Sequence, residues 1–384
     1  MPIPFNKPFI VGKELYYIAQ AVLEGHIAGD GSFTQKCHAF LEEKFNAPKV
    51  LLTHSCTAAL EIAALLCDIE PGDEVILPSF TFVSTANAFC LRGAKPVFVD
   101  IRQDTLNIDE DLIEQAITER TKVIVPVHYA GVGCEMDKIM DIARRHNLIV
   151  VEDAAQGVSS QYTEKYLGTI GDLGTYSFHE TKNFISGEGG ALVINNELFI
   201  ERAEIIREKG TNRSKFFRGE VDKYTWVDLG SSYLPSEIVA AFLYAQLEHM
   251  EEIHRRRQEI FNFYYNGLAP LAAQGALQLP YIPSKCQCNN HLFYILLPDE
   301  KTRDGLMKHL KVSGIHAVFH YLPLHLSKMG ISLTRKKKNL PITESISKRL
   351  LRLPCYYELS STSQECVVKK ITDYLSSTFR LLKD

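Results

Sequence analysis

The sequence lacks the features that mark membrane-spanning, secreted and strongly charged proteins. No apolar run approaches the ~20 residues that cross a bilayer, and the opening MPIPFNKPF lacks the charged-then-apolar layout of a signal peptide. The 42 Lys and Arg against 46 Asp and Glu give a net charge of −4, which offers no general attraction for nucleic acid or anionic lipid. We therefore expect a cytoplasmic protein that binds neither membrane nor nucleic acid.

The cysteines do not form a recognisable framework either. Nine are present, an odd number, and only Cys286 and Cys288 lie close together in the sequence. A lone C-x-C is weak evidence for a metal site, and scattered thiols in a long chain are typical of a reducing cytosol. We expect no metal.

What is present is an α/β pattern. The 384 residues, 46% apolar and 23% charged, suggest two to three domains. Short buried runs predict strands and alternate with helical patterns, which indicates a mostly parallel sheet with helices on both faces. The predicted strands are 49–53, 74–77, 96–100, 122–127 and 148–152, and the predicted helices are 55–68, 85–92, 109–118 and 136–146.

The second half predicts a connecting helix and a smaller domain. A helical stretch runs from Pro235 to Leu268, and we divide the chain into a large domain, 1–250, and a small C-terminal α/β domain, 251–384. The basic run Arg335–Lys338 is predicted to be a solvated loop. In the small domain we expect strands at 290–297 and 317–321 and helices at 302–312 and 363–379.

Two segments concentrate chemistry: V-V-E-D-A-A-Q, 150–156, and S-F-H-E-T-K-N, 177–183. Asp153 closes an apolar strand, where a bare carboxylate is costly without a partner. Taken alone, Asp153 is typical of a helix cap and Lys182 of a solvated lysine. A third element changes this, because S-C-T (55–57) follows a strand and opens a helix whose free N–H groups suit a phosphate. Ser177 could add a hydroxyl group that binds the same phosphate.

A phosphate seat, a buried acid and a lysine at the strand ends of one sheet are what pyridoxal 5′-phosphate (PLP) requires. At this point the sequence resembles a known family, the DegT/DnrJ/EryC1/StrS sugar-nucleotide aminotransferases. The motifs that carry the resemblance extend through the chain: P-S-F-T-F-V-S-T-A-N-A (78–88), F-V-D-I (98–101), P-V-H-Y-A-G (126–131), E-D-A-A-Q (152–156), S-F-H-E-T-K (177–182) and G-E-G-G-A (187–191). The resemblance implies the aspartate aminotransferase-like PLP-dependent transferase fold, type I.

A narrower branch is also indicated by four stretches. They resemble the dTDP-4-amino-4,6-dideoxygalactose transaminases of enterobacterial common antigen synthesis, which implies dTDP-4-dehydro-6-deoxy-D-glucose as substrate and L-glutamate as amino donor. The stretches are I-R-E-K-G-T-N-R (206–213), F-F-R-G-E-V-D-K-Y-T-W (216–226), G-S-S-Y-L (230–234) and V-F-H-Y-L-P-L-H (318–325).

The resemblance also implies roles for individual residues. Lys182 would bind the cofactor as a Schiff base and then move a proton between cofactor and substrate, with pyridoxamine phosphate (PMP) as the intermediate form. Asp153 would keep the pyridine nitrogen protonated. Gln156 would lie by the ring oxygen and Phe82 would stack on the ring. Cys56, Thr57 and Ser177 would hold the phosphate.

The sequence departs from the broad family in two places. Cys56 stands where many relatives have glycine, and Ser232 and Leu234 stand where many have Asn and Arg. In relatives that Asn reaches the phosphate of the neighbouring subunit, so Ser232 is a further cofactor-binding candidate. The resemblance implies a homodimer with shared active sites, and closed two-fold dimers are the commonest assembly.

The sequence indicates the substrate-binding residues less clearly than the cofactor-binding ones. A dTDP-sugar carries two phosphates, so Arg213, Arg218 and Lys223 are candidate partners, each with a solvated side chain as the alternative. His128 and Tyr321 are further candidates. The histidines at 316, 320 and 325 suggest a packed domain edge, because the family uses no metal.

Three alternative functions stay open at this point. One is a related 4- or 3-aminotransferase with a different keto sugar or product stereochemistry. Another is a pyridoxamine-dependent sugar dehydratase, against which Lys182 argues, because there a histidine replaces the lysine. The third is a catalytically silent binding or regulatory protein.

Overall fold

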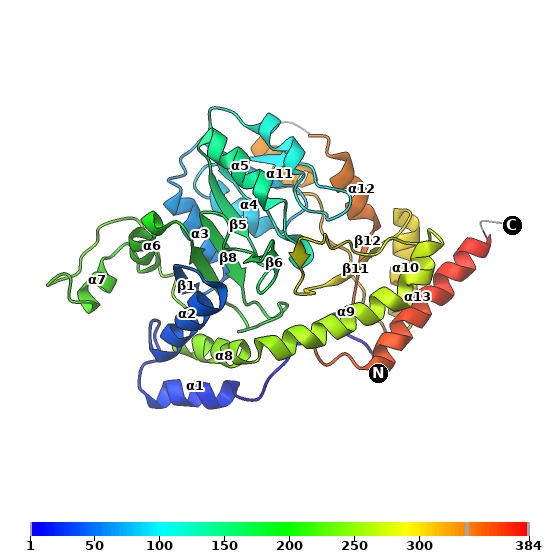
Figure 1. Cartoon of the computed structure of the whole chain (residues 1–384), viewed down its shortest axis with the longest axis horizontal. Coiled ribbons are helices and arrows are strands. Elements are labelled where there is room, and N and C mark those ends of the chain that lie inside the picture. The colour runs from blue at the N-terminus through cyan, green and yellow to red at the C-terminus, as the bar shows by residue number, and fades with distance from the viewer. Residues whose placement is uncertain (1, 335–337, 382–384) are drawn as a thin grey trace.

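A computed structural model describes residues 2–334 and 338–381 of the chain. A large sheet with helices on both sides occupies one part of the molecule, and a small sheet with long helices occupies the other (Figure 1). The expected α/β class with a large, mostly parallel sheet is confirmed.

The central sheet has the strand order β1-β9-β8-β5-β4-β2-β3. Strands β8, β5, β4, β2 and β3 are parallel, whereas β9 runs antiparallel to both β1 and β8. The bounds are β1 Lys49–Thr53, β2 Glu74–Pro78, β3 Lys95–Val99, β4 Thr121–Ile124, β5 Ile149–Asp153, β8 Leu173–Ser177 and β9 Gly190–Ile194.

Helices cover both faces because both faces of these strands are apolar. Val50 and Leu52 pack in one cluster with residues of α2, α5 and α8, whereas Leu51, between them, packs against α3 and α6 on the other face. Adjacent strand residues point to opposite faces, so a continuous apolar run needs cover on both. The helices of this part are α1 Glu14–Leu23, α2 Ser32–Phe45, α3 Cys56–Leu66, α4 Val83–Cys90, α5 Met136–His146, α6 Ile200–Arg207, α7 Arg213–Phe217 and α8 Glu237–Glu248.

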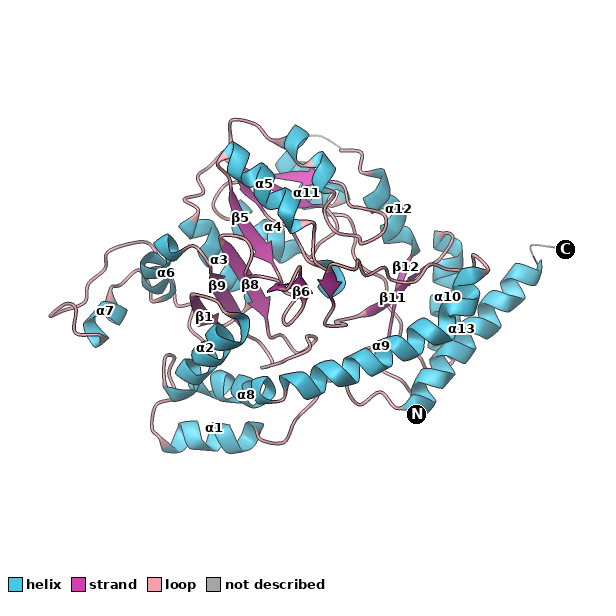
Figure 2. Ribbon diagram, in the orientation of Figure 1, coloured by secondary structure: helices cyan, strands magenta, loops and turns pink. Residues whose placement is uncertain are grey.

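The C-terminal part has its own apolar core. Strands β11 Phe293–Leu296 and β12 Leu350–Leu353 pair antiparallel, and their inward residues pack against the long helices. Figure 2 shows α9 running beside the large sheet and on to α10 and α13. The helices are α9 Met250–Ala273, α10 Glu300–Val312, α11 Lys328–Thr334, α12 Pro341–Arg349 and α13 Ser361–Leu381, and a small sheet joins β6 Gln161–Tyr162, β7 Lys165–Tyr166 and β10 Cys286–Gln287.

Three expected elements are wrong. The helix expected over 109–118 is two short 3₁₀ turns, Glu110–Leu112 and Glu114–Ala116. The helix expected from Pro235 to Leu268 is two helices, α8 and α9, which meet at His249. The strand expected at 317–321 is a single bridge between Val318 and Arg352.

The break at His249 supports a domain boundary near residue 250, which stays a proposal. Of the basic run, residues 335–337 lie outside the described residues. Lys338 is exposed and lies in a loop, as expected, and its Nζ donates to the Phe98 carbonyl at 2.5 Å.

Over residues 2–334 and 338–381, none of the helices combines the length and the hydropathy that a membrane crossing requires.

Candidate active site

The chemical groups gather at one edge of the sheet, where β5 and β8 end. Asp153 is the last residue of β5 and pairs with Thr175 of the parallel strand β8. Two residues on, Ser177 ends β8 opposite Gly190 of β9, and Gly190 in turn lies opposite Thr53 at the end of β1. The sheet register therefore brings Asp153, Ser177 and the chain that enters α3 together, as parallel α/β sheets place their ligand sites.

Helix α3 begins at this edge. Ser55 caps it, accepting a hydrogen bond at Oγ from the Ala58 amide at 3.1 Å, and Thr57 donates from Oγ1 to Ser84 Oγ at 2.9 Å. Gly190 lies so close to the helix start that a Cβ on it would lie 2.4 Å from the Cys56 amide nitrogen. The first amides of the helix are therefore held tightly against β9, and such N–H groups have no partner inside the helix.

Cys56 contributes its backbone rather than its sulfur. Burial raises the pKa of the Cys56 thiol to about 12, and the nearby Asp153 carboxylate adds to the rise. The thiol is thus protonated at neutral pH and is no anion that would repel a phosphate. The departure from glycine at this position leaves the amide available.

Asp153 is fixed by two hydrogen bonds. Its side chain is buried, with Oδ2 accepting from Thr85 Oγ1 at 2.6 Å and Oδ1 accepting from the Ala155 amide at 3.1 Å. Thr85 lies on α4, and Phe82 caps the same helix with its ring 57% exposed. A large exposed aromatic ring at the start of the helix that holds Asp153 is a surface on which a flat ligand could stack.

Lys182 borders a small cavity, which is lined by Ala155, Gln156, Val158, Ser177, Lys182, Asn183, Phe184, Asn289 and His291. Burial lowers the pKa of Lys182, against the opposing influence of Cys56 and Asp153. A lysine with a lowered pKa holds more of the neutral amine, which is the form that attacks a carbonyl carbon.

Gln156 and Tyr321 connect the two parts of the molecule across this cavity. Gln156 Oε1 accepts from the Ala130 amide at 2.7 Å, and its Nε2 donates to the Tyr321 hydroxyl at 3.0 Å. The Tyr321 ring lies 6.4 Å from the Phe82 ring, centroid to centroid. The predicted positions 82, 156 and 321 are therefore neighbours.

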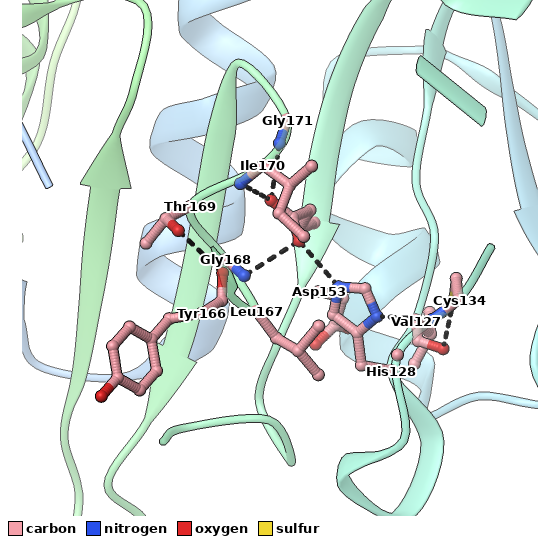
Figure 3. Close-up of polar contacts among 12 residues, drawn as sticks. Val127, His128, Cys134, Asp153, Tyr166, Leu167, Gly168, Thr169, Ile170 and Gly171 are labelled. Carbon is pink, nitrogen blue, oxygen red and sulfur yellow. Dashed lines mark hydrogen bonds and ion pairs between the residues drawn. The ribbon is translucent and has the colours of Figure 1, made fainter. Parts of the chain in front are cut away.

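Behind Asp153, a buried carboxylate fixes the adjoining loop (Figure 3). Glu152 is fully buried and accepts four hydrogen bonds: from His128 Nε2 at 2.8 Å and from the amides of Gly168, Ile170 and Gly171 at 2.9, 2.7 and 2.6 Å. Because adjacent residues of a strand point to opposite faces, this network anchors β5 from the side away from the cavity.

His128 is therefore not a substrate contact, and that prediction is wrong. Its side chain is 0% exposed and both ring nitrogens are engaged. The Cys134 amide donates to Nδ1 at 3.2 Å, which leaves the proton on Nε2, facing Glu152. His128 follows the end of an expected strand, which suggests a site residue, but its side chain faces the interior.

The predicted phosphate contacts of the sugar nucleotide lie on a projecting arm, residues 208–230, which carries α7 away from the sheet (Figure 1). Arg213 pairs with Glu208 at 3.5 Å, and Arg218 pairs with Glu204 at 2.8 Å. Lys223 and Ser232 are exposed. Within one chain these four residues do not join Lys182, so their predicted roles stay predictions.

Sequence reasoning missed several residues at the cavity. Thr85, which binds Asp153 directly, lies within the quoted 78–88 motif one helical turn after Phe82, and that spacing could have found it. His291, whose Nδ1 lies 2.9 Å from Asn183 Oδ1, and Asn289 had no local signal.

The donor set fits PLP, the cofactor that the sequence resemblance implied. The α3 amides and Ser177 suit a phosphate, Asp153 suits a protonated ring nitrogen, and Phe82 offers a stacking surface. Lys182, at the border of the cavity, supplies the amine.

Known proteins resemble the chain over nearly its whole length. The uncharacterized protein MJ1066 of Methanocaldococcus jannaschii is 35% identical, over 97% of this chain and 98% of its own. A pleiotropic regulatory protein of Geobacillus stearothermophilus is 35% identical over 90% of each chain. The spore coat polysaccharide biosynthesis protein SpsC of Bacillus subtilis is 32% identical over 97% of this chain and 96% of its own.

Solved structures agree with this. The aminotransferase TlmJ of Streptoalloteichus hindustanus superposes with a TM-score of 0.90, at 29% identity, over 98% of this chain and all of its own. Spr1654 of Streptococcus pneumoniae, a proposed sugar aminotransferase, superposes in its PMP form with a TM-score of 0.92, at 26% identity over both whole chains. A PLP form of Spr1654 matches as well.

A family model describes the same likeness in sequence and covers residues 10–372. The match includes the ends of β5 and β8, α3, Lys182 and most of the small domain. The chain belongs to the DegT/DnrJ/EryC1/StrS aminotransferase family.

Proposed function

We propose that the protein transfers an amino group from L-glutamate to C4 of dTDP-4-dehydro-6-deoxy-D-glucose, with PLP as cofactor. The products are dTDP-4-amino-4,6-dideoxy-D-galactose and 2-oxoglutarate. The observation that carries the reaction class is that Lys182 borders a cavity beside the sheet edge where β5 ends in Asp153 and α3 begins, near enough for Asp153 and Cys56 to influence the pKa of its amine. The sugar is supported by the resemblance of the stretches 206–213, 216–226, 230–234 and 318–325 to one branch of the family.

The cofactor, when bound, supplies an electron sink and carries the amino group between the two substrates. The chain contributes position and proton transfer. Asp153, held by Thr85 and Ala155, presents a fixed negative charge to a ring nitrogen. Lys182 moves a proton at the reacting carbon, and the lowered pKa of its amine favours the neutral form that accepts one. Amides of Cys56 and Thr57 and the Ser177 hydroxyl would hold the phosphate.

A homodimer with shared sites is part of the proposal. Large apolar side chains are exposed on α1 and on the 208–230 arm: Leu15, Tyr16, Leu23, Phe217, Tyr224 and Trp226. A second copy that covered them would bury this apolar surface and bring Arg213, Arg218, Lys223 and Ser232 to a neighbouring cavity. Such patches mark interaction sites on soluble proteins.

The dimer has a built-in reporter, because Trp226 is the only tryptophan of the sequence and is 72% exposed in the single chain. We expect sedimentation to give twice the chain mass. Dilution should dissociate the dimer and shift the fluorescence of Trp226 to the red together with loss of activity. An active monomer at low concentration contradicts shared sites.

Placement in the cytoplasm is supported by the nine cysteines, which all carry free thiols. Cell fractionation tests it, and recovery of the enzyme outside the cytoplasm would contradict it.

The product decides between this proposal and a related aminotransferase. Purified enzyme with PLP, L-glutamate and the dTDP-keto sugar should give an axial 4-amine, the galacto product, by nuclear magnetic resonance. An equatorial amine, or an amine at C3, would assign the related reaction instead. Loss of the 3-hydroxyl without amine transfer would assign a dehydratase, and no turnover of any keto sugar would favour a regulatory protein.

A further inference from the structure

Asn183 and His291 line the cavity together with Lys182. Asn183 follows Lys182 in the chain, whereas His291 belongs to the segment 289–291, which precedes β11 of the small domain. Asn183 Oδ1 lies 2.9 Å from His291 Nδ1. A hydrogen-bonded polar pair therefore adjoins the reactive lysine, and the proposed chemistry of Lys182 and Asp153 does not use it.

The direction of this hydrogen bond follows from its surroundings. Asn183 Nδ2 donates to the Asn289 carbonyl at 2.9 Å. A carbonyl oxygen only accepts, so the amide nitrogen of Asn183 must face Asn289 and its amide oxygen must face His291. Because that oxygen also only accepts, His291 Nδ1 carries a proton. In the neutral ring Nε2 is then the nitrogen with the lone pair, on the far side of the ring from Asn183.

The backbone that carries His291 is fixed by further hydrogen bonds. Asn289 Nδ2 donates to two carbonyls of the 156–158 segment, at 2.9 and 2.8 Å, and Asn289 Oδ1 accepts from the His291 amide at 3.0 Å. From α9, Arg257 donates to the carbonyls of Asn290 and His291. The ring thus has a fixed place and a fixed tautomer, as a group that takes part in proton transfer requires.

The ring is neutral although it lies in the same cavity as an amine. Burial lowers the pKa of His291 well below its usual range, and the positive charge of Lys182 acts in the same direction, as do Arg257, Arg352 and His320. Like charges in one cavity disfavour each other, so Lys182 and His291 hold one proton more readily than two. Loss of the proton from Lys182 removes one of the charges that keep His291 neutral.

We propose that His291 is the proton acceptor for Lys182. Nε2 takes a proton from the Nζ ammonium, so that an N–H bond breaks at Nζ and forms at Nε2, and the reverse transfer returns it. Nδ1 keeps its hydrogen bond to Asn183 throughout, and this bond strengthens when the ring is charged, which makes Asn183 a positioning residue. The inference rests on the proposed function, in which the neutral Lys182 amine reacts.

The tautomer is measured in the cofactor-free protein with ¹⁵N-labelled histidine. We expect nuclear magnetic resonance to show the ring proton of His291 on Nδ1 at neutral pH, and the loss of this signal in His291→Gln identifies it. A neutral ring with its proton on Nε2 would have no lone pair on that nitrogen and would overturn the inference. This readout depends on no reaction.

The rate is measured in the holoenzyme as the spectral conversion from PLP to PMP at saturating L-glutamate. His291→Asn keeps a donor for Asn183 at the position of Nδ1 and removes Nε2. His291→Gln keeps an acceptor near the position of Nε2, but its amide takes no proton at neutral pH. We expect both variants to lose about 100-fold or more in rate, the ordinary contribution of a general base, while the half-saturating L-glutamate concentration changes by less than about threefold.

The matched control is His254→Asn. His254 is half-buried on α9, where its Nδ1 lies 3.4 Å from Ser159 Oγ, and we expect its replacement to change the rate by less than about twofold. If His291 only holds Asn183 or only accepts a hydrogen bond, one of its two variants restores that contact. A rate within about threefold of wild type in either His291 variant therefore overturns the inference. If wild type itself fails to react with L-glutamate, the proposed function fails instead.

Discussion

Replacing Glu152 by glutamine should destabilise the protein far more than the loss of one surface charge. The buried carboxylate accepts at Oε1 from the amides of Ile170 and Gly171, and at Oε2 from Gly168 and His128. A glutamine can satisfy only one of these pairs with its amide oxygen. Its NH₂ group would then face two donors, and neither could turn into an acceptor.

His128 cannot relieve this conflict by moving its proton. Its Nδ1 must stay an acceptor for the Cys134 amide, so Nε2 keeps the hydrogen. Two buried donors are therefore left unpaired, each at a cost of about 1–3 kcal/mol. We expect Glu152→Gln to lower the free energy of unfolding by about 2–6 kcal/mol.

Urea unfolding of the cofactor-free protein, followed by circular dichroism at one fixed protein concentration, measures this change. The matched control is Glu119→Gln, an exposed residue for which we expect a change within about 0.5 kcal/mol. If Glu152→Gln unfolds within about 0.5 kcal/mol of wild type, at an unchanged slope with urea, the network in Figure 3 does not anchor β5 as described.

Two further predictions concern the cavity. Because burial disfavours the Lys182 ammonium, its pKa lies below the ordinary 10.5, and the fraction of reactive amine increases as pH rises through that lowered value. Capture of PLP by the cofactor-free protein should therefore reach half its maximal rate below pH 10.5. A midpoint at or above pH 10.5 contradicts the lowered pKa. Gly190→Ala would place a Cβ 2.4 Å from the Cys56 amide nitrogen and displace the start of α3. Because overpacking costs about 1–3 kcal/mol, we expect the affinity for PLP in equilibrium titrations to fall at least about tenfold. Unchanged affinity would show that the helix start does not hold the phosphate.

The sequence predicts well those features that local pattern determines. Strand β1 and helix α5 have the predicted bounds, 49–53 and 136–146. Asp153 ends its strand as expected, and S-C-T opens α3 after β1. These features depend on runs of buried residues and on capping side chains, which lie next to one another in the chain.

Features that depend on distant partners were not predictable. His128 looked like a site residue because it follows an apolar run, but its environment is set by Glu152, 24 positions away. The run at 317–321 has the composition of a strand, yet only Val318 finds a partner, Arg352. The side chain of Arg352 lies over the Phe5 ring and donates to the Phe319 carbonyl, and no local pattern connects these residues to it.

The absorbance spectrum of the purified protein before and after L-glutamate tests the central claim most directly. We predict a band of protein-bound PLP near ~410–430 nm that L-glutamate moves to ~330 nm, the position of PMP. Lys182→Ala should retain the fold and lose this conversion. A wild-type spectrum that shows bound PLP but does not respond to L-glutamate, or a Lys182→Ala variant that completes the transamination, would contradict the account.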